Sequence, residues 1–474
     1  MRRGALILVT TSLAAFLTPF ISSSISFVVP KIGQEMDLTF YQAALLPLVI
    51  LIPLASFILL FGRLSDQLGR ILLFRIGLIV FSLGSIVALL SPNFQILVAS
   101  LFTLGLGASI MSANSTAIVS TIFKDGRGFA LGINAMSVYL GLTIAPFISG
   151  LVVEFSNWRL LFLIVLPIAL VGFLLSFVTL RTELKGGKGM KLYGSLLFAI
   201  LLVSISLYLS LGYIYGFVRL LPLLLLFIVS IILFLLEERR SRTPLISMKM
   251  MKLRRTFVAS NLAALLNYLG TFSIVFVFSI YLQVTLHISP FLSGLYILPE
   301  PVLMVLMSPI AGRLSDRIGS RKIASTGMVI IGLSFLIFFV LGQPSVREIL
   351  LILAFLGAGF GLFSAPNTNS VMGSIKMEYS GFASGFLGTM RFIGQLASII
   401  VATYLFSLEI PRNVMVGIFS GLYVSIGQLY FYDFVTGFKQ VMLLSSIISF
   451  AGAVSSMMRD KTGNVLIHSF HKTS

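Results

Sequence analysis

The sequence predicts an all-α integral membrane protein with fourteen transmembrane helices, arranged as two six-helix bundles plus two extra central helices. The chain has 474 residues, of which 58% are hydrophobic and 10% are charged. It contains continuous apolar runs, and two short motifs recur about 250 positions apart. A soluble domain cannot present so much apolar surface to water, so a soluble enzyme, a secreted disulfide scaffold and a disordered protein are excluded.

Fourteen apolar segments are long enough for a membrane-spanning helix of about 20 residues. They are continuous rather than alternating, which excludes a transmembrane β-barrel. The first is a retained span and not a signal peptide, because its apolar run is too long and no small-residue cleavage site follows it. The expected spans are 5–29, 41–61, 71–90, 94–122, 129–153, 159–180, 192–213, 217–236, 256–284, 288–311, 323–342, 346–374, 381–407 and 436–458.

The basic residues set the expected orientation. An even number of spans puts both termini on one side, and that side carries 26 of the 33 lysines and arginines, against six on the other. The positive-inside rule makes this side cytoplasmic. The formal net charge of +18 is therefore a topology signal and not a nucleic-acid footprint. We expect a multi-pass protein of the cell (plasma) membrane with cytoplasmic N- and C-termini.

Metal and disulfide chemistry are not expected. The chain has no cysteine, and its three histidines are scattered along the sequence. A disulfide, a thiolate metal site and a cysteine nucleophile are thus excluded, and we expect neither a metal nor a cofactor.

An internal repeat relates the two halves of the chain. The motif Gly-Arg-Leu-Ser-Asp occurs at 62–66 and at 312–316, each time with a further glycine three positions later. The motif Gly-Phe-Ala-x-Gly occurs at 128–132 and at 381–385. The intervals are 250 and 253 residues, and the motifs occupy equivalent places in the order of spans. Spans 1–6 therefore repeat as spans 9–14 in the same orientation, whereas spans 7 and 8 have no mate.

The repeat sets the expected domain organisation. We expect an N-terminal six-helix bundle at 1–182, two extra transmembrane helices with cytoplasmic linkers at 183–255, a C-terminal six-helix bundle at 256–460 and a cytoplasmic tail at 461–474. Two such halves place a substrate path at their interface, near the middle of the membrane. No loop is long enough for a catalytic domain, so we do not expect an enzyme.

With these motifs, the chain resembles the major facilitator superfamily and, within it, the fourteen-span branch of drug:proton antiporters. The resemblance rests on the stretch from Gly62 to Arg70, on Trp158-Arg159 before span 6, on Pro366-Asn367 and on a span-5 pattern. It implies the major facilitator fold and, for the chain, a monomer. The span-5 pattern comprises Gly132, Gly141, Pro146 and Gly150.

The span-5 pattern has two readings. A proline bends a membrane helix and glycines allow close packing, so span 5 can seal the two halves in one transport state. The alternative is ordinary helix packing. The chain also departs from the branch at Ile21, where an acid is usual in span 1, and at Leu101, where an arginine is usual in span 4.

The repeated loop motif predicts a gate latch. An aspartate near a helix N-terminus gains from the macrodipole and can pair with a nearby arginine. The alternative is a solvated turn, in which a surface pair contributes only about 0–1 kcal/mol. The residues of the two gating motifs are Gly62, Arg63, Asp66, Gly69, Arg70, Gly312, Arg313, Asp316 and Gly319.

Two charged residues lie inside spans. Glu300 is the only acid well inside one, and burying a lone carboxylate in a bilayer costs about 2.5 kcal/mol or more. It is either the proton-coupling residue or a structural group. Arg391 is a partner for Glu300, an anion-binding group or a structural tie. The candidates for a substrate cavity are Ser22, Ser26, Asn114, Asn134, Asn267, Asn367 and Arg391.

These features predict a secondary active transporter, with proton-coupled efflux of lipophilic or amphipathic small molecules by alternating access as the leading hypothesis. Its expected partners are a small-molecule substrate, protons and membrane lipid. The departures at Ile21 and Leu101 favour the alternative of a facilitator or importer of a neutral or anionic metabolite without proton coupling. A membrane-bound enzyme or a non-transporting sensor is a remote alternative.

Overall fold

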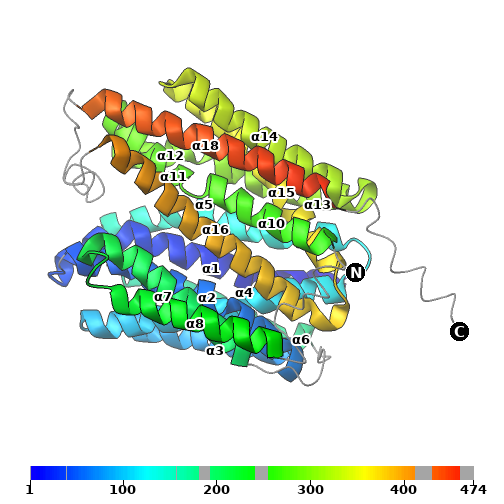
Figure 1. Ribbon diagram of the computed structural model, residues 1–474. Helices are drawn as coiled ribbons and strands as arrows, with labels where there is room; N and C mark the ends of the chain where they lie inside the picture. Colours follow the sequence, from blue (N-terminus) through cyan, green and yellow to red (C-terminus); the bar gives the residue numbers. More distant parts are fainter. Residues whose placement is uncertain are drawn as a thin grey trace, which may run out of the picture. The chain divides into compact units, whose positions relative to one another are not determined.

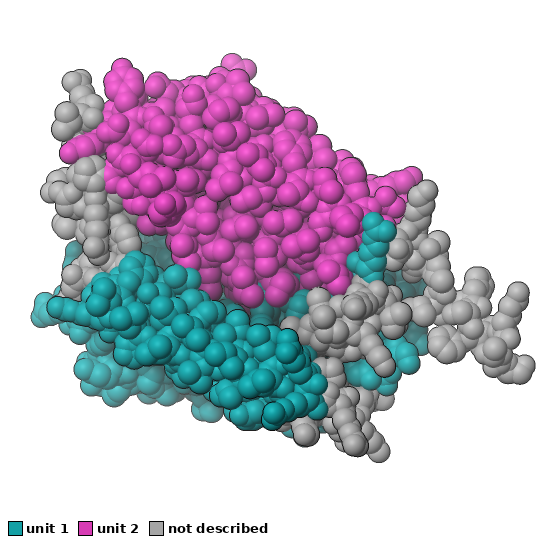
Figure 2. All heavy atoms as spheres, in the orientation of Figure 1, with its two compact units in different colours: residues 1–257, 371–389 teal, residues 258–370, 390–474 magenta. Residues whose placement is uncertain are grey.

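The computed structural model describes residues 2–38, 40–155, 157–180, 193–240, 255–410 and 430–459. Within these ranges the chain is helical and contains no β-strand. Twelve of the described helices are long and apolar enough to cross a membrane by length and composition. The chain divides into two compact units, which Figure 2 shows in different colours: unit 1 comprises residues 1–257 and 371–389, and unit 2 comprises residues 258–370 and 390–474.

The first eight helices, which Figure 1 labels, belong to unit 1. They are α1 (Arg2–Glu35), α2 (Phe40–Leu68), α3 (Arg70–Leu89), α4 (Phe94–Ile122), α5 (Arg127–Phe155), α6 (Leu160–Thr179), α7 (Tyr193–Tyr215) and α8 (Leu221–Arg240). Within the unit, α4 packs against α3 and α2, α5 packs against α1, and α7 packs against both α2 and α8. Glycine permits the closest of these approaches, since a β-carbon on Gly107 of α4 would meet the backbone of Phe81 of α3 at 2.5 Å.

The remaining helices lie in unit 2 or connect the units. They are α10 (Arg255–Thr271), α11 (Ile274–Ile280), the π-helical turn η1 (Tyr281–Thr285), α12 (Pro290–Ile297), α13 (Pro299–Ile318), α14 (Ser320–Leu341), α15 (Val346–Gly373), the 3₁₀ turn η2 (Met377–Tyr379), α16 (Ser380–Glu409) and α18 (Phe431–Met457). The end of α15, η2 and the first ten residues of α16 belong to unit 1, although the sequence repeat assigns them to the second half of the chain.

The expected number of fourteen spans is supported only approximately. The seventh span appears as α7, which has 23 residues. The ninth span is broken between α10 and α11, so neither piece has the length of a span. The expected tail at 461–474 and most of the linkers within 183–255 lie outside the described residues.

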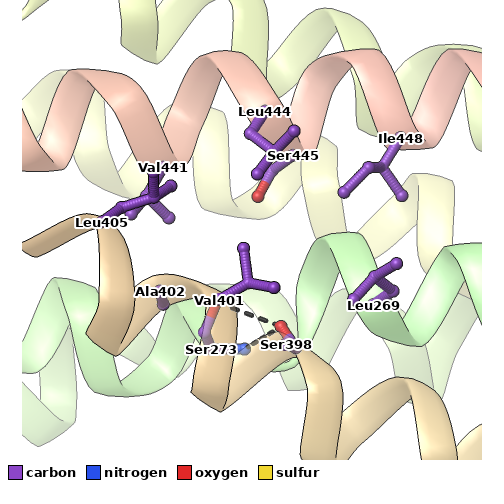
Figure 3. A pocket seen from close by; sticks show the side chains of 10 residues that line it. All are labelled: Leu269, Ser273, Ser398, Val401, Ala402, Leu405, Val441, Leu444, Ser445 and Ile448. Carbon is purple, nitrogen blue, oxygen red and sulfur yellow. Dashed lines mark hydrogen bonds between the residues drawn. The ribbon is translucent and has the colours of Figure 1, made fainter.

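Side-chain hydroxyls satisfy the backbone at the break in the ninth span. The N–H of Ser273 donates to the Oγ of Ser398 on α16 across 3.0 Å, and Ser398 Oγ lies 3.1 Å from Ser273 Oγ. Figure 3 shows both contacts beside a small cavity that Ser445 of α18 also lines. Non-helical backbone at membrane depth requires such partners, because lipid offers none.

The tenth span counts as one membrane-length helix, Leu292–Ile318, with the single residue Leu298 between two helical segments. Helix α12 ends at Ile297, and α13 begins at Pro299, where a proline suits the first helical position. Glu300, expected about halfway along an unbroken span, therefore lies in the first turn of α13.

Candidate functional site

Helices α2 and α3 meet in a one-residue turn in unit 1. Helix α2 ends at Leu68 and α3 begins at Arg70, and Gly69 between them has φ 120°. That backbone conformation strongly favours glycine. The turn places Asp66 and Arg70 one helical turn apart, with 2.8 Å between a carboxylate oxygen and Nη2. Both side chains are buried, so they form a buried ion pair.

Asp66 caps the N-terminus of α16. Its Oδ1 accepts the backbone N–H of Gly381 at 2.9 Å, and its Oδ2 accepts that of Phe382 at 2.8 Å. The first N–H groups of a helix have no partner within the helix, and a carboxylate there also gains from the macrodipole. The sequence predicted that Asp66 lies near a helix N-terminus. In the structure this is the N-terminus of α16, which contains the second copy of the Gly-Phe-Ala motif at 381–383.

Arg70 binds the segment that leads into α16. Its Nη2 donates to the carbonyl oxygens of Met377 and Glu378, at 2.8 and 3.1 Å, and its Nη1 donates to Thr121 of α4 at 3.3 Å. The ion pair thus offers acceptors to the N–H groups at the start of α16 and donors to the carbonyls just before it. We call Asp66, Arg70 and the residues 377–382 that they bind the latch.

The backbones of α2 and α16 touch beside the latch. A β-carbon on Gly62 would collide with the carbonyl oxygen of Gly381, and the reverse is also true. One turn further along, a β-carbon on Gly385 would meet the carbonyl of Ile58 at 2.8 Å. Glycine is therefore needed at these crossing points, which brings the N–H groups of α16 within reach of Asp66.

The second copy of the loop motif is built differently. Arg313, Asp316 and Gly319 are exposed, whereas their counterparts Arg63, Asp66 and Gly69 are buried. Ser320 stands where the first copy has Arg70, so this copy lacks the intrahelical ion pair. Asn369 of α15 donates to Asp316 at 3.3 Å and to Ser315 at 3.1 Å. Gly312 is buried in α13.

The span-5 residues lie on α5, and they differ in their surroundings. Gly141 is a crossing point, since a β-carbon there would meet the carbonyl oxygen of Phe16 on α1 at 2.6 Å. Gly132 is buried and Pro146 is half-buried, while Gly150 is exposed and has open space around it.

Three consecutive residues of α15 bind three different elements of unit 2. Asn367 accepts a hydrogen bond from Arg459, which follows α18. Thr368 accepts one from Nη2 of Arg391 on α16 at 2.6 Å, and Asn369 donates to the end of α13. Arg391, expected as a possible partner of Glu300, instead binds Thr368 and lies 5.9 Å from the ring centroid of Tyr268. Arg459 directly follows the last expected span, and the structure buries its side chain.

Glu300 is buried and its Oε2 has no hydrogen-bond partner among the described residues. Its backbone packs against α15, because a β-carbon on Gly357 would collide with the carbonyl of Glu300. A buried carboxyl without a partner is costly when charged, so the neutral form is favoured there.

The remaining cavity candidates belong to both units. In unit 1, Asn134 donates to Ser115 at 2.9 Å and Asn114 donates to the carbonyl of Ile110 at 2.8 Å. Ser22 bonds back to the carbonyl of Pro19 at 3.2 Å, and Ser26 is exposed. In unit 2, the Nδ2 of Asn267 lies 3.2 Å from a methionine sulfur.

The opposite end of unit 1 carries an ion pair that the sequence interpretation did not single out. The carboxylate of Glu35, at the end of α1, accepts hydrogen bonds from Arg159 and, at 2.7 Å, from Nε1 of Trp158. Arg159 also donates to the carbonyl of Ser91 at 3.0 Å. Burial alone raises the pKa of the Glu35 carboxyl, but the donors of Arg159 and Trp158 outweigh it and hold that pKa below its usual value.

Among the described residues, no group of three or more His, Cys, Asp or Glu side chains is placed to hold a metal ion. Two of the features described above are unusual for helices of this length and apolarity. One is a latch of charged side chains that grips a helix end, and the other is a buried carboxyl without a partner. Membrane-length helices, a six-span repeat and a charged latch together define the class of multi-pass membrane transporters.

Comparison with known proteins places the chain within that class. The sequence profile of the Major Facilitator Superfamily matches residues 11–399, and the chain belongs to this family. It is 27% identical to the riboflavin transporter RibZ of Clostridioides difficile (strain 630), over 82% of this chain and 86% of that protein. It is also 27% identical to the multidrug resistance protein Stp of Mycobacterium tuberculosis, over 72% of this chain and 64% of that protein.

The fold has relatives among solved structures. The proton:xylose symporter XylE, in complex with 6-bromo-6-deoxy-D-glucose, superposes with a TM-score of 0.66 over 95% of this chain and 94% of its own. Its sequence identity of 14% makes this a likeness of fold alone.

Proposed function

We propose that the chain is a proton-coupled exporter of lipophilic or amphipathic small molecules that works by alternating access. The similarity to a protein named for multidrug resistance supports the substrate class. The family supports transport itself, because proteins of this fold move small molecules across membranes.

The observation that carries the proton coupling is the isolation of Glu300. A carboxyl buried without a cation or a hydrogen-bond donor favours its protonated form and releases the proton when water or a cation reaches it. A transporter that alternates between two states provides that change of surroundings. Glu300 is therefore the proposed proton carrier.

The latch is the proposed gate on the cytoplasmic side. Asp66 and Arg70 bind backbone groups at the start of α16 and in the segment just before it. The desolvation cost of the buried ion pair is offset only while those backbone groups complete its hydrogen bonds. Release of the latch exposes both charges to water.

The orientation and organisation follow from the charge asymmetry and the repeat. We propose cytoplasmic N- and C-termini, a plasma-membrane location and a monomeric transporter with bundles at 1–182 and 256–460, flanking the segment 183–255. Protease accessibility of a tag after Ser474 in right-side-out vesicles tests the orientation, since digestion from outside would contradict it.

The direct test measures transport in proteoliposomes with an imposed pH gradient. Amphipathic fluorescent dyes serve as probe substrates, with riboflavin in parallel. A proton-coupled exporter accumulates a dye against its concentration gradient only while the pH gradient lasts, and an uncoupler abolishes the accumulation. Transport that is indifferent to the gradient and the uncoupler would overturn the proposal.

A second candidate is a facilitator or importer of a neutral or anionic metabolite. The similarity to a riboflavin transporter and the apolar residues Ile21 and Leu101 favour it. Riboflavin equilibration that ignores the pH gradient, with no transport of the dyes, would establish this candidate in place of the first.

A further inference from the structure

The end of α18 carries a deeply buried arginine, Arg459, whose side chain is 2% exposed. Its Nη2 donates to the Oδ1 of Asn367 on α15 and, at 2.9 Å, to the Oγ of Ser456. One turn earlier, Ser455 donates to the carbonyl of Ala259 on α10 at 2.9 Å. The guanidinium therefore lies among three helices of unit 2.

Most of the hydrogen-bond donors in this cluster have no acceptor. The Nε and Nη1 of Arg459 are buried without a partner among the described residues, and so is the Nδ2 of Asn367. A guanidinium has five N–H groups and Nη2 accounts for two of them, so three remain unused. Arg70 is buried to the same degree, but its Nε, Nη1 and Nη2 all donate to protein acceptors. Arg459 is thus an exception within its own chain.

The charge of Arg459 is also uncompensated by the helices around it. Helix α10 contains no acid, and the single acids of α15 and α18 are Glu348 and Asp433, each in the first turn of its helix. At a rise of about 1.5 Å per residue, Glu348 is roughly 28 Å along α15 from Asn367, and Asp433 is roughly 39 Å along α18 from Arg459. Burial lowers the pKa of Arg459 to about 9 and no carboxylate offsets this effect, so the group stays charged at neutral pH. A buried cation without a counter-charge is unfavourable.

An oxyanion has the two properties that this cluster lacks, namely acceptor oxygens and negative charge. Guanidinium and amide N–H groups are the donors with which proteins bind phosphate and carboxylate oxygens. Met457 and Met458 directly precede Arg459 and are each 48% exposed, so the buried donors lie within one helical turn of the surface of unit 2. The proposed orientation puts this end of α18 on the cytoplasmic side, where anionic lipid headgroups are concentrated.

We propose that Arg459 and Asn367 form an oxyanion-binding site in unit 2, which takes a phosphoryl group either from free phosphate or from the headgroup of an anionic lipid. The bound oxygens accept hydrogen bonds from the donors that have no protein partner, and the anion thereby ties α18 to α15. The site is independent of the proposed proton coupling, and its test reads binding without transport.

Thermal unfolding of the purified protein tests the site with inorganic phosphate as the probe. In a neutral detergent, sodium phosphate is compared with sodium chloride at equal pH and ionic strength. We expect phosphate to raise the unfolding midpoint of the wild type by about 2–5 °C more than chloride does. Arg459→Gln is expected to lose this increment. Arg317→Gln, which removes an exposed arginine of the same unit, is expected to keep it.

Asn367→Asp keeps Arg459 and gives its guanidinium a counter-charge within the protein. Because the Oδ1 of Asn367 already accepts from Nη2, a carboxylate there takes the place of the anion. We expect the midpoint of this variant in chloride to exceed that of the wild type, and phosphate to add nothing. If Asn367→Asp and Arg459→Gln instead lower the midpoint equally in phosphate and in chloride, Arg459 is a structural tie and the anion site is wrong.

Lipid nanodiscs separate the two sources of the phosphoryl group. The same proteins are compared, in phosphate-free buffer, in phosphatidylcholine nanodiscs with and without phosphatidylglycerol. A lipid headgroup is the ligand if phosphatidylglycerol raises the wild-type midpoint, Asn367→Asp abolishes that increment and free phosphate has no effect in detergent. If neither phosphate nor phosphatidylglycerol produces an increment that Arg459→Gln removes, the proposal is overturned.

Discussion

The carboxylate of Asp66 accepts the backbone N–H of Phe382 across 2.8 Å, although the two residues are 316 positions apart in the sequence. The contact is a helix cap supplied from another helix. Because the acceptor is an ionised side chain and the donor a backbone amide at a helix N-terminus, charge and dipole act in the same direction. Changes at this pair are therefore expected to alter gating more than folding.

Asp66→Asn is expected to lower the transport rate about tenfold or more while leaving membrane insertion intact. Asparagine keeps an acceptor oxygen, but its amide nitrogen faces N–H donors, and its neutral side chain leaves Arg70 without a counter-charge. Flux in proteoliposomes, normalised to the amount of inserted protein, measures the effect.

Asp316→Asn is the control for this variant. Its aspartate is exposed, and Ser320 stands where the first copy of the motif has Arg70, so the loss of flux is expected to be smaller. Equal losses in the two variants would mean that burial in the latch is not what makes Asp66 important.

Gly62→Ala is expected to destabilise the protein by about 1–3 kcal/mol, since the added methyl collides with the backbone of Gly381. Gly150→Ala is the matched control, because nothing lies within 4 Å of the added carbon. Thermal unfolding in detergent compares the two. An unchanged midpoint for Gly62→Ala would show that α2 and α16 separate at little cost.

Glu300→Gln is expected to abolish accumulation driven by a pH gradient while preserving substrate exchange at equal concentrations. Glutamine keeps the shape of the buried side chain but releases no proton. Counterflow of labelled substrate measures exchange, and uphill flux measures coupling. If the variant still concentrates substrate with the wild-type pH dependence, Glu300 is a structural group.

The ion pair between Glu35 and Arg159 predicts a pH dependence. The pKa of Glu35 is lower in the folded protein than in the unfolded chain, so the pair contributes fully above the usual glutamate value of about 4.3. It loses this contribution as the pH falls through the lowered value. The pair is partly exposed, which limits its contribution to about 1 kcal/mol or less.

We therefore expect Glu35→Gln to lower the unfolding temperature at pH 7, and we expect its difference from the wild type to shrink as the pH falls below about 4.3. Thermal scans of both proteins from pH 7 to below this value measure the difference. A difference that grows toward low pH would contradict the sign of the shift.

The sequence predicted the helical fold and half of the latch. Recurring motifs and continuous apolar runs are local signals, so the spans and the six-span repeat follow from composition and spacing. Glu300 was recognisable as the only acid well inside an expected span, but its surroundings were not predicted, because Arg391 was a candidate partner. Asp66 and Phe382 are linked by a hydrogen bond between a side chain and a backbone N–H far away in the sequence. Residue types do not encode which backbone N–H will donate a hydrogen bond to a given carboxylate.

Other features depend on packing that a single sequence does not reveal. Arg459 follows the last apolar run and reads as a cytoplasmic charge, but its side chain turns back to Asn367. Arg391 was a possible partner of Glu300, and only the structure shows that Thr368 holds it. The break between α10 and α11 lies within one apolar run, where the serine that accepts the freed N–H comes from α16.

The break in the ninth span divides one long helix into two segments, α10 and α11. A continuous helix resists bending because its backbone hydrogen bonds run along its whole length. Helices α10 and α11 are joined at Phe272 and Ser273, where the backbone N–H of Ser273 donates to the hydroxyl of Ser398. Tilting α11 thus strains the hydrogen bond from Ser273 to Ser398 and leaves the backbone hydrogen bonds within α10 and α11 intact. Bending is therefore expected at the contact between Ser273 and Ser398. Ser398→Ala is the substitution that would make this joint easier to bend without changing α10 or α11.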